Sequence, residues 1–238
     1  MDILDLEKNT LAFDYFWYKA RRNLISVIFS KYDIKNMSIL EVGCGAGSQL
    51  ESLSRNNNNV VGSDINHKAL AEEEKRGFSV FYQDIEERVT KGEQYDVVCA
   101  FDVLEHIKND EVAIQNIYAL LKPNGLFVFT VPTFQFLFSG HDNYLQHYRR
   151  YAKREIVQKL LKNDFEIVEL NYWNFILFPL MAVKRLLSKH KYPKSDVDNL
   201  PKPLNQLLYG ILLFENKLIE KGVQLPFGLS VIGVAKKR

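Results

Sequence analysis

The chain of 238 residues has only two cysteines, no long apolar run and no dense basic cluster. Cys44 and Cys99 lie in apolar, strand-like stretches, so we expect reduced core residues of a cytoplasmic protein and no disulfide. The first ten residues, MDILDLEKNT, are acidic and lack the apolar centre that a signal peptide needs. Without a dense basic cluster, we expect no nucleic-acid partner.

The most apolar stretch, YWNFILFPLMAVKRLL at 172–187, is interrupted by Pro179 and stays apolar for twelve residues. A span of the bilayer needs about 20 residues, so this stretch is not expected to cross a membrane. We favour a helix packed on the domain or on a partner subunit of an oligomer. The alternative is peripheral contact with the inner face of the membrane, with Trp173, Lys184 and Arg185 at the head groups.

Charge is unevenly spread, although the formal net charge is only +2. Residues 1–140 contain 14 Lys and Arg against 20 Asp and Glu, whereas residues 141–238 contain 17 against 9. This imbalance has two interpretations that stay open here. It is either an ordinary solvated surface or a basic face for an acidic substrate or an anionic membrane.

Short apolar runs alternate with helical patterns, which predicts βαβ units and an α/β domain with a parallel sheet. Strands are predicted at 38–43, 59–65, 78–84, 95–101, 126–132, 165–173 and 229–237. Helices are predicted at 46–55, 67–76, from strand four to about Leu121, 153–164, 175–190 and 203–221, with a turn at 122–125. The composition, 47% hydrophobic and 25% charged, is that of one globular domain over 1–238.

A further helix is predicted near the N-terminus, because apolar residues recur there at helical spacing. They are Phe13, Phe16, Trp17, Ala20, Leu24, Val27 and Ile28. Core contact is the simplest interpretation of this stripe, and a lid over a site is the alternative.

The stretch LEVGCGAGSQL ends a predicted strand in Gly43-x-Gly45-x-Gly47 and begins a helix. Glycines there permit a tight turn and close approach of a ligand to the backbone. Dinucleotide sites instead use G-x-G-x-x-G. Glu41 lies two residues before the first glycine, and a carboxylate there favours a cationic ligand over a pyrophosphate.

Two further acids end predicted strands, Asp64 after the second and Asp84 after the third. Asp64 can accept hydrogen bonds from ribose hydroxyls, and Asp84 can accept from an adenine amino group with Ile85 beside the ring. Helix capping is the bland alternative for either acid. Acids at successive strand ends, together with the glycine turn, favour a ligand site at the carboxyl edge of the sheet.

The motifs LEVGCGAG, VVGSDIN, FYQDIEE, YDVVCAFDVLEHI and LLKPNGLFVFTVP resemble those of class I S-adenosylmethionine-dependent methyltransferases, over about residues 38–132. The resemblance is to the branch that includes ubiquinone-biosynthesis methyltransferases. It implies a Rossmann-like seven-stranded sheet with an antiparallel last strand and helices on both faces. Strand 229–237 suits that last position, with a helical insertion before it.

The resemblance also implies S-adenosylmethionine as cofactor, S-adenosylhomocysteine as product, and a set of contacts. The methionine portion is assigned to Glu41, Gly43, Gly45 and Gly47, the ribose to Asp64 with Ile65 beside it, the adenine to Asp84 and Ile85, and Phe101 lies along the cofactor. The chain then divides into an N-terminal helical segment (1–36), a cofactor-binding core (37–132) and an acceptor side (133–238).

The run FDVLEHIKND places Asp102, Glu105 and His106 at helical spacing on one face. They could hold a divalent cation, and some ubiquinone-pathway relatives resemble this run and look metal-assisted. A capping box with Asp102 as N-cap and Glu105 at N3 uses the same residues. We favour the cap and assign no metal site; His106 also remains a candidate base.

The run HDNYLQHYRRY at 141–151 follows strand five, where this fold places the acceptor. Methyl transfer to oxygen requires removal of a hydroxyl proton, and a neutral histidine is the usual base near pH 7. His141 is our first candidate, Asp142 would orient it or act beside it, and His147 is the second candidate.

The same run offers groups for binding an acceptor. Arg149 and Arg150 could clamp a phosphate or carboxylate, and Tyr144, Tyr148 and Tyr151 could stack on a sugar or ring. The alternative is a surface loop whose arginines pair with acids of the domain. FDYFWYKARR, this run and PFGLS together resemble a bacterial methyltransferase subgroup linked to envelope or polysaccharide building blocks.

We therefore predict an S-adenosylmethionine-dependent methyltransferase. Our first choice is O-methylation of a small or lipid-linked acidic acceptor, such as a sugar or an envelope precursor. One alternative is metal-assisted transfer to a phenolic or quinone-type ring, and another is a protein that binds the cofactor without catalysis. A nicotinamide oxidoreductase is a more distant alternative.

Overall fold

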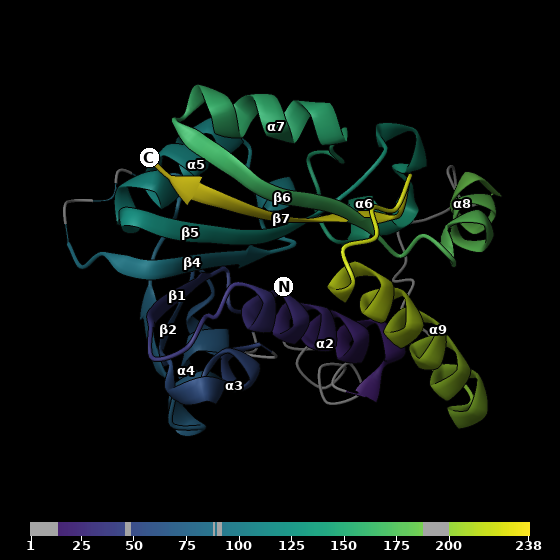
Figure 1. Ribbon diagram of the computed structural model, residues 1–238, viewed down its shortest axis with the longest axis horizontal. Coiled ribbons are helices and arrows are strands. Elements are labelled where there is room, and N and C mark those ends of the chain that lie inside the picture. The colour runs from purple at the N-terminus through teal and green to yellow at the C-terminus, as the bar shows by residue number, and fades with distance from the viewer. Residues whose placement is uncertain (1–13, 46–48, 88, 90–91, 188–199) are drawn as a thin grey trace.

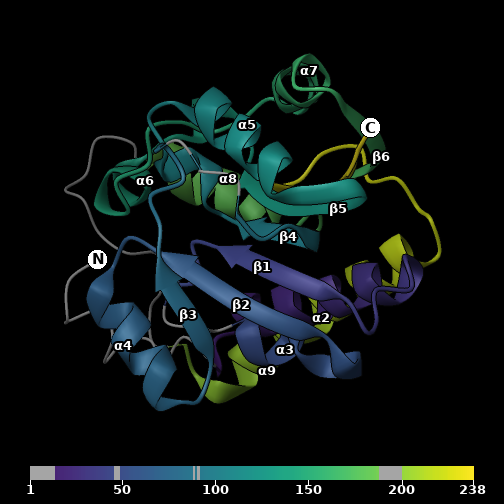
Figure 2. The same ribbon diagram turned by 90° about the vertical axis from the view of Figure 1, so that its left-hand side faces the viewer.

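The computed structural model describes residues 14–45, 49–87, 89, 92–187 and 200–238, arranged around one seven-stranded sheet (Figure 1). Its strands are β1 (Ser38–Val42), β2 (Asn59–Asp64), β3 (Ser79–Tyr82), β4 (Tyr95–Phe101), β5 (Leu121–Pro132), β6 (Phe165–Trp173) and β7 (Ser230–Lys237). The order is β3-β2-β1-β4-β5-β7-β6, with β1 between β2 and β4 as Figure 2 shows. Only β7 pairs antiparallel with its neighbours, which confirms the predicted fold class.

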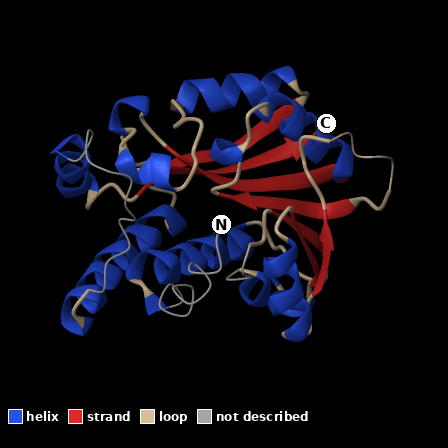
Figure 3. Ribbon diagram, turned by 180° about the vertical axis from the view of Figure 1, so that it is seen from behind, coloured by secondary structure: helices blue, strands red, loops and turns tan. Residues whose placement is uncertain are grey.

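Helices cover both faces of the sheet (Figure 3). The α-helices are α2 (Phe16–Lys31), α3 (Leu50–Leu53), α4 (His67–Lys75), α5 (Asp110–Leu120), α6 (Gly140–Tyr144), α7 (Lys153–Lys162), α8 (Phe178–Leu187) and α9 (Lys202–Glu220). Short 3-10 turns are η1 (Arg55–Asn57), η2 (Leu104–His106) and η3 (Gln135–Leu137). Helices α8 and α9 form the predicted insertion between β6 and β7. None of the described helices has the length and apolarity needed to cross a membrane.

The core forms on both faces because successive strand residues point to opposite sides. On one face, Leu40 and Val98 pack in a buried cluster with Ile114 of α5 and Ile156 of α7. On the other face, the neighbouring positions Ile39 and Val97, Leu24 of α2 and Leu212 of α9 belong to a second cluster. Burial on both sides explains why these strands are almost continuously apolar in sequence.

The N-terminal stripe is core contact, as predicted. Phe16, Ala20, Leu24 and Ile28 are buried on α2, whereas Phe13 lies outside the described residues. Asn216 of α9 donates to the carbonyl of Ala20 at 2.9 Å and accepts from the Trp173 indole at 2.9 Å. One buried amide therefore joins α2, α9 and the end of β6.

Two predicted helices were too long. The stretch expected at 46–55 is helical only from Leu50 to Leu53, and a 3-10 turn containing Asn56 at φ 59° follows it; residues 46–48 are outside the description. After β4 the chain forms η2 first, and α5 begins only at Asp110. The predicted turn at 122–125 lies inside β5, as a register shift between the pairs Tyr95–Leu121 and Val97–Leu126.

Two of the three anchors in the membrane interpretation of 172–187 are wrong, whereas the third, Lys184, is exposed. Trp173 is fully buried, and Arg185 turns inward to pair with Asp142. The apolar residues of α8 that face outward are Leu180, Val183, Leu186 and Leu187.

Candidate active site

The glycine turn follows β1 and is held by the end of β2. The amides of Gly43 and Cys44 donate to the carbonyl of Ser63 at 2.8 and 3.0 Å, and the amide of Gly45 donates to Asp64 Oδ2 at 2.8 Å. Gly43 has φ +68°, and a Cβ there would lie 2.6 Å from Val103 Cγ2. Only glycine fits this position. Gly47 lies outside the described residues.

Glu41 is buried at the end of β1, 2% exposed, and its Oε2 has no hydrogen-bond partner among the described residues. Burial raises the pKa of this carboxyl to about 8; Arg21 opposes the shift, and Glu73 and Asp64 add to it. A buried carboxylate without a partner is costly and favours a bound cation. S-adenosylmethionine carries both an ammonium and a sulfonium, so this orphaned oxygen fits that cofactor.

Arg21 is a candidate binding residue that the sequence did not single out. It is 6% exposed on α2, its guanidinium forms an ion pair with Asp102, and it lies 4.7 Å from the Trp17 ring centroid. When the side-chain amide of Gln49 is oriented with its oxygen toward Arg21, this oxygen accepts hydrogen bonds from Arg21 Nε at 3.1 Å and Nη2 at 3.2 Å. An arginine on the buried face of an apolar helix was the available signal, because such a charge needs a partner. The guanidinium can pair with the carboxylate of a cofactor at the glycine turn.

The two acids predicted to contact the nucleoside do not cap helices. Asp64 Oδ1 accepts from the amide of Asn66, and Asn66 itself caps α4. Asp84 Oδ1 accepts from the amide of Glu86 at 2.8 Å, and the described residues that directly follow, 85–87, form no helix. The capping alternative therefore fails for both acids, and their contacts with ribose and adenine stay a prediction.

Three apolar positions predicted beside the cofactor differ in exposure. Ile65 is exposed next to Asp64, whereas Ile85 and Phe101 are buried in the two core clusters. Ile65 is thus the one of the three with substantial surface available to a ligand in this structure.

The capping box predicted at Asp102 and Glu105 is wrong. Val103 precedes η2, no side chain caps that turn, and Asp102 has φ +55°. The Asp102 carboxylate instead pairs with Arg21. The tertiary contact with α2 prevails because an ion pair with a buried guanidinium outweighs one capping hydrogen bond.

The acceptor-side segment is organised around the buried carboxylate of Asp142. It accepts from the amide of Ser139 at 2.9 Å, from Arg150 Nε at 2.8 Å and from Arg185 Nη1 at 3.0 Å, and it contacts His147 Nδ1 at 3.0 Å. Burial opposes ionisation, but His147 and the two guanidinium groups hold the pKa of Asp142 well below its usual range. Asp142 therefore orients His147 and ties α6 to α8.

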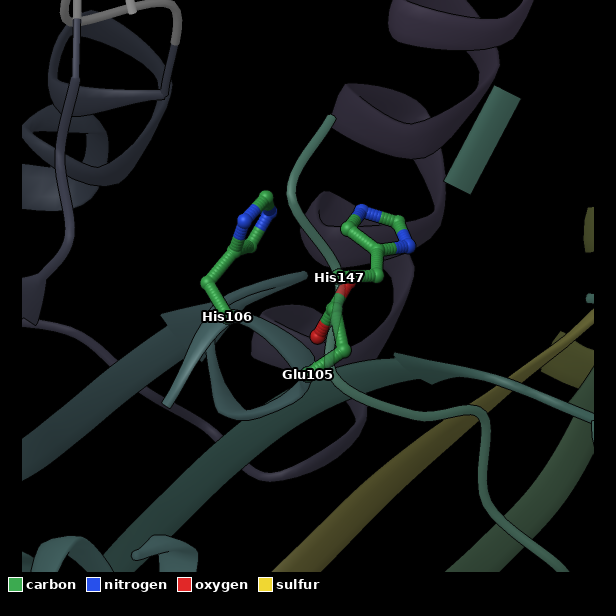
Figure 4. Close-up of side chains that lie close together, drawn as sticks. All are labelled: Glu105, His106 and His147. Carbon is green, nitrogen blue, oxygen red and sulfur yellow. The ribbon is translucent and has the colours of Figure 1, made fainter. Parts of the chain in front are cut away.

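Glu105, His106 and His147 come together from η2 and the acceptor-side segment; we call them the Glu–His–His cluster (Figure 4). The amide of Tyr148 donates to the Glu105 carbonyl at 2.8 Å, which joins the two segments. The centroids of the His106 and His147 rings are 4.5 Å apart, and the angle between the ring planes is 88°. One ligand atom from each residue lies within 4.8 Å of the others.

Electrostatics in this cluster favour uncharged groups. Glu105 is 1% exposed, neither carboxyl oxygen has a partner among the described residues, and burial followed by Asp102 raises its pKa well above the usual value. His106 is exposed as a residue, yet desolvation of its ring, followed by the neighbouring His147, lowers its pKa to about 4. A neutral imidazole near a buried carboxyl is suited to receiving a proton or binding a cation.

Two of the predicted acceptor-binding side chains are structural. Arg150 is buried by its contacts with Asp142 and with the carbonyl of Thr133. Tyr151 is 0% exposed, and its hydroxyl lies 2.7 Å from Asp110 Oδ2. These side chains cannot clamp or stack on an acceptor, because the interior already uses their polar groups.

The remaining predicted residues keep some exposure. Arg149 lies 3.1 Å from Asp110 and donates to the carbonyl of Lys108, as the surface-loop alternative proposed. Tyr148 is exposed, and His141 and Tyr144 are partly exposed on α6. Roles for His141 and Tyr144 stay predictions.

The glycine turn that follows β1, the buried Glu41 whose Oε2 has no partner among the described residues, and this strand order define a class I S-adenosylmethionine-dependent methyltransferase. Comparison with known proteins agrees. Residues 16–170 match the family described as "Methyltransferase domain", and the chain belongs to that family. S-adenosylmethionine is its cofactor, and the bound cofactor supplies an activated methyl group.

The curated relatives include ubiquinone biosynthesis O-methyltransferases. That of Coxiella burnetii is 29% identical over 119 residues, covering 45% of this chain and 51% of the relative. That of Bradyrhizobium diazoefficiens is 31% identical over 125 residues, covering 50% and 49%. The chain thus spans about half the length of these relatives.

Among solved structures, a methyltransferase from Archaeoglobus fulgidus has a TM-score of 0.60 at 18% identity, covering 99% of this chain and 100% of its own. Magnesium protoporphyrin IX methyltransferase from Synechocystis, solved with bound S-adenosylmethionine, has a TM-score of 0.55 at 15% identity, covering 92% and 78%. These likenesses establish the fold.

Proposed function

We propose that this protein transfers the methyl group of S-adenosylmethionine to a hydroxyl oxygen of an acceptor bound beside the Glu–His–His cluster. The observation that carries the proposal is the pairing of His147 with Asp142 at 3.0 Å. It fixes the ring through Nδ1 and leaves Nε2 for the reacting side. This buried Asp–His pair lies in the acceptor-side segment that follows β5 and is more than packing requires.

The chemistry needs little beyond alignment and proton removal. An oxygen lone pair forms the bond to the methyl carbon, the carbon–sulfur pair returns to sulfur, and the hydroxyl proton leaves. We assign proton removal to the Glu–His–His cluster. His141, in the first turn of α6, is the competing candidate.

A phenolic or otherwise apolar acceptor is supported better than an anionic sugar. Aromatic rings gather where the end of β5, α8 and the loop before β7 meet. The ring centroid of Phe134 lies 5.5 Å from those of both Phe136 and Phe178. The ring centroid of Phe178 lies 5.0 Å from that of Phe227. Phe136 is 54% exposed, so an incoming ring has a surface to stack on. The curated relatives are O-methyltransferases of ubiquinone biosynthesis, which supports the same class of acceptor.

An acidic sugar or lipid-linked acceptor is the second candidate. The excess of basic residues in 141–238 favours it, whereas the internal use of Arg150 weakens it. A lipid-linked acceptor would also suit the outward Leu180, Val183 and Leu187 of α8 and peripheral contact with a membrane.

The test uses methyl-labelled cofactor with two acceptor panels, dihydroxyphenols and phosphorylated sugars. We expect label to be incorporated in the phenol panel. His147→Ala should lower turnover at least 100-fold and leave cofactor affinity unchanged. His67→Ala on α4 is the matched control, since His67 stacks on Tyr82 away from the cluster. Label only in sugars would select the second candidate, and cofactor binding without label in any fraction of a host extract would favour a non-catalytic protein. Loss of turnover in His141→Ala but not in His147→Ala would identify His141 on α6 as the base.

A further inference from the structure

We propose that the Glu–His–His cluster binds one divalent transition-metal ion, of the kind represented by Mn²⁺, Co²⁺ and Zn²⁺, with an open position for the acceptor hydroxyl. Figure 4 shows the three side chains converging from η2 and the acceptor-side segment. The binding site stands on geometry alone, whereas its role toward the acceptor rests on the proposed function.

The donor set and its spacing suit such an ion. Bonds from Zn²⁺ to nitrogen and carboxylate oxygen are about 2.0–2.2 Å, so donor atoms around it lie roughly 3–4 Å apart. The ligand atoms of Glu105, His106 and His147 already lie within 4.8 Å of one another. Two imidazoles and one carboxylate select first-row transition metals over Mg²⁺, which prefers oxygen, and three protein ligands leave positions open.

Glu105 supplies independent support, because its carboxyl group is buried with both oxygens unpartnered among the described residues. The nearby guanidinium groups are engaged elsewhere: Arg21 pairs with Asp102, and Arg150 pairs with Asp142. A carboxylate in that position needs a cation or a proton. An ion between Glu105 and the two imidazoles satisfies it directly.

His147 is also held as metal-binding histidines usually are. Its Nδ1 contacts the Asp142 carboxylate, which fixes the ring and frees Nε2 as the ligand atom. Asp142 is fixed in turn by Arg150 and Arg185. Mutation of such a supporting carboxylate typically weakens metal binding 10–100-fold.

This ligand set differs from the one that the D-x-x-E-H spacing suggested. Asp102 is withdrawn by its ion pair with Arg21, and His147, 41 positions beyond His106 in sequence, takes its place. The ion would therefore join the turn after β4 to the acceptor-side segment. With Nε2 of His147 bound to the ion, this imidazole would no longer accept the proton itself. A hydroxyl bound at the open position would instead lose its proton to water more readily, with no change in the oxidation state of the metal.

The test uses the full chain, freed of metal by a chelator and titrated with Co²⁺, Zn²⁺ and Mg²⁺ by calorimetry and by visible absorption of Co²⁺. We expect one Co²⁺ or Zn²⁺ per chain and affinity for Mg²⁺ at least tenfold weaker. Glu105→Gln and His147→Ala should weaken Co²⁺ binding at least tenfold, while retained S-adenosylmethionine binding shows that both variants fold. His67→Ala should leave Co²⁺ affinity unchanged, and Asp102→Asn, which removes a nearby charge but no ligand, should weaken it less than either ligand variant does.

Absence of Co²⁺ and Zn²⁺ binding, or binding that His147→Ala leaves intact, overturns the proposal and leaves Glu105 as a protonated core group. Loss of binding in Asp102→Asn but not in His147→Ala overturns it in favour of the ligand set on η2. The two proposals fail separately. Metal binding without methylation of any acceptor removes the proposed function, whereas methylation that survives chelation removes the role of the ion.

Discussion

Cofactor affinity should depend on pH through Glu41. Its pKa is about 8 in the free protein, compared with an ordinary value of 4.5, because the carboxyl group is buried and its Oε2 has no partner among the described residues. The predicted contact with the ammonium of S-adenosylmethionine requires the ionised form, so we expect the proton to leave on binding. Below pH 8 each pH unit costs a factor of ten in affinity, about 1.4 kcal/mol.

We therefore expect the dissociation constant to tighten about tenfold between pH 6 and pH 7, with about one proton released per cofactor bound. Calorimetry in two buffers of different ionisation enthalpy measures both quantities. Glu41→Gln should bind more weakly and lose the pH dependence over this range. Equal pH slopes in the wild type and Glu41→Gln would refute the reasoning.

Stability gives a second measurement on the same residue. Because the folded-state pKa is raised, the folded protein keeps a proton that the unfolded chain loses between pH 4.5 and 8. The unfolding free energy of the cofactor-free protein should fall as pH rises through that window, by an upper bound of about 3 kcal/mol at pH 7. Urea titrations of Glu41→Gln should lack this decline.

Three further substitutions test the site and its support. Arg21→Leu should weaken cofactor binding at least tenfold in calorimetry, because it removes the guanidinium at the glycine turn and leaves Asp102 unpaired. Tyr151→Phe should lower the unfolding free energy by about 1–2 kcal/mol in urea titration through loss of the contact with Asp110, with acceptor KM unchanged; a changed KM would return Tyr151 to the acceptor site. Gly43→Ala should lower the unfolding free energy by about 1–2 kcal/mol because of its φ of +68°, and it should abolish cofactor binding; wild-type binding would disprove the close approach.

The sequence alone determined the sheet and the cofactor side. Strand β4 begins and ends where its apolar run does, because a strand buried on both faces is marked by local composition. The edge strand β6 also has its predicted bounds. Glu41, Gly43 and Asp64 were identifiable because parallel strands end at one edge, so chain order alone places them together.

Tertiary structure decided the acceptor side. Asp102 would have capped a helix by its local spacing, but Arg21, 81 positions earlier, holds it in an ion pair. Asp142 joins Arg185 from α8 to His147, and His147 meets Glu105 across 42 positions. Local sequence patterns indicate which side of a segment is buried and which faces solvent. The partners of a buried charge depend instead on which distant segments the packing brings within about 3 Å of it.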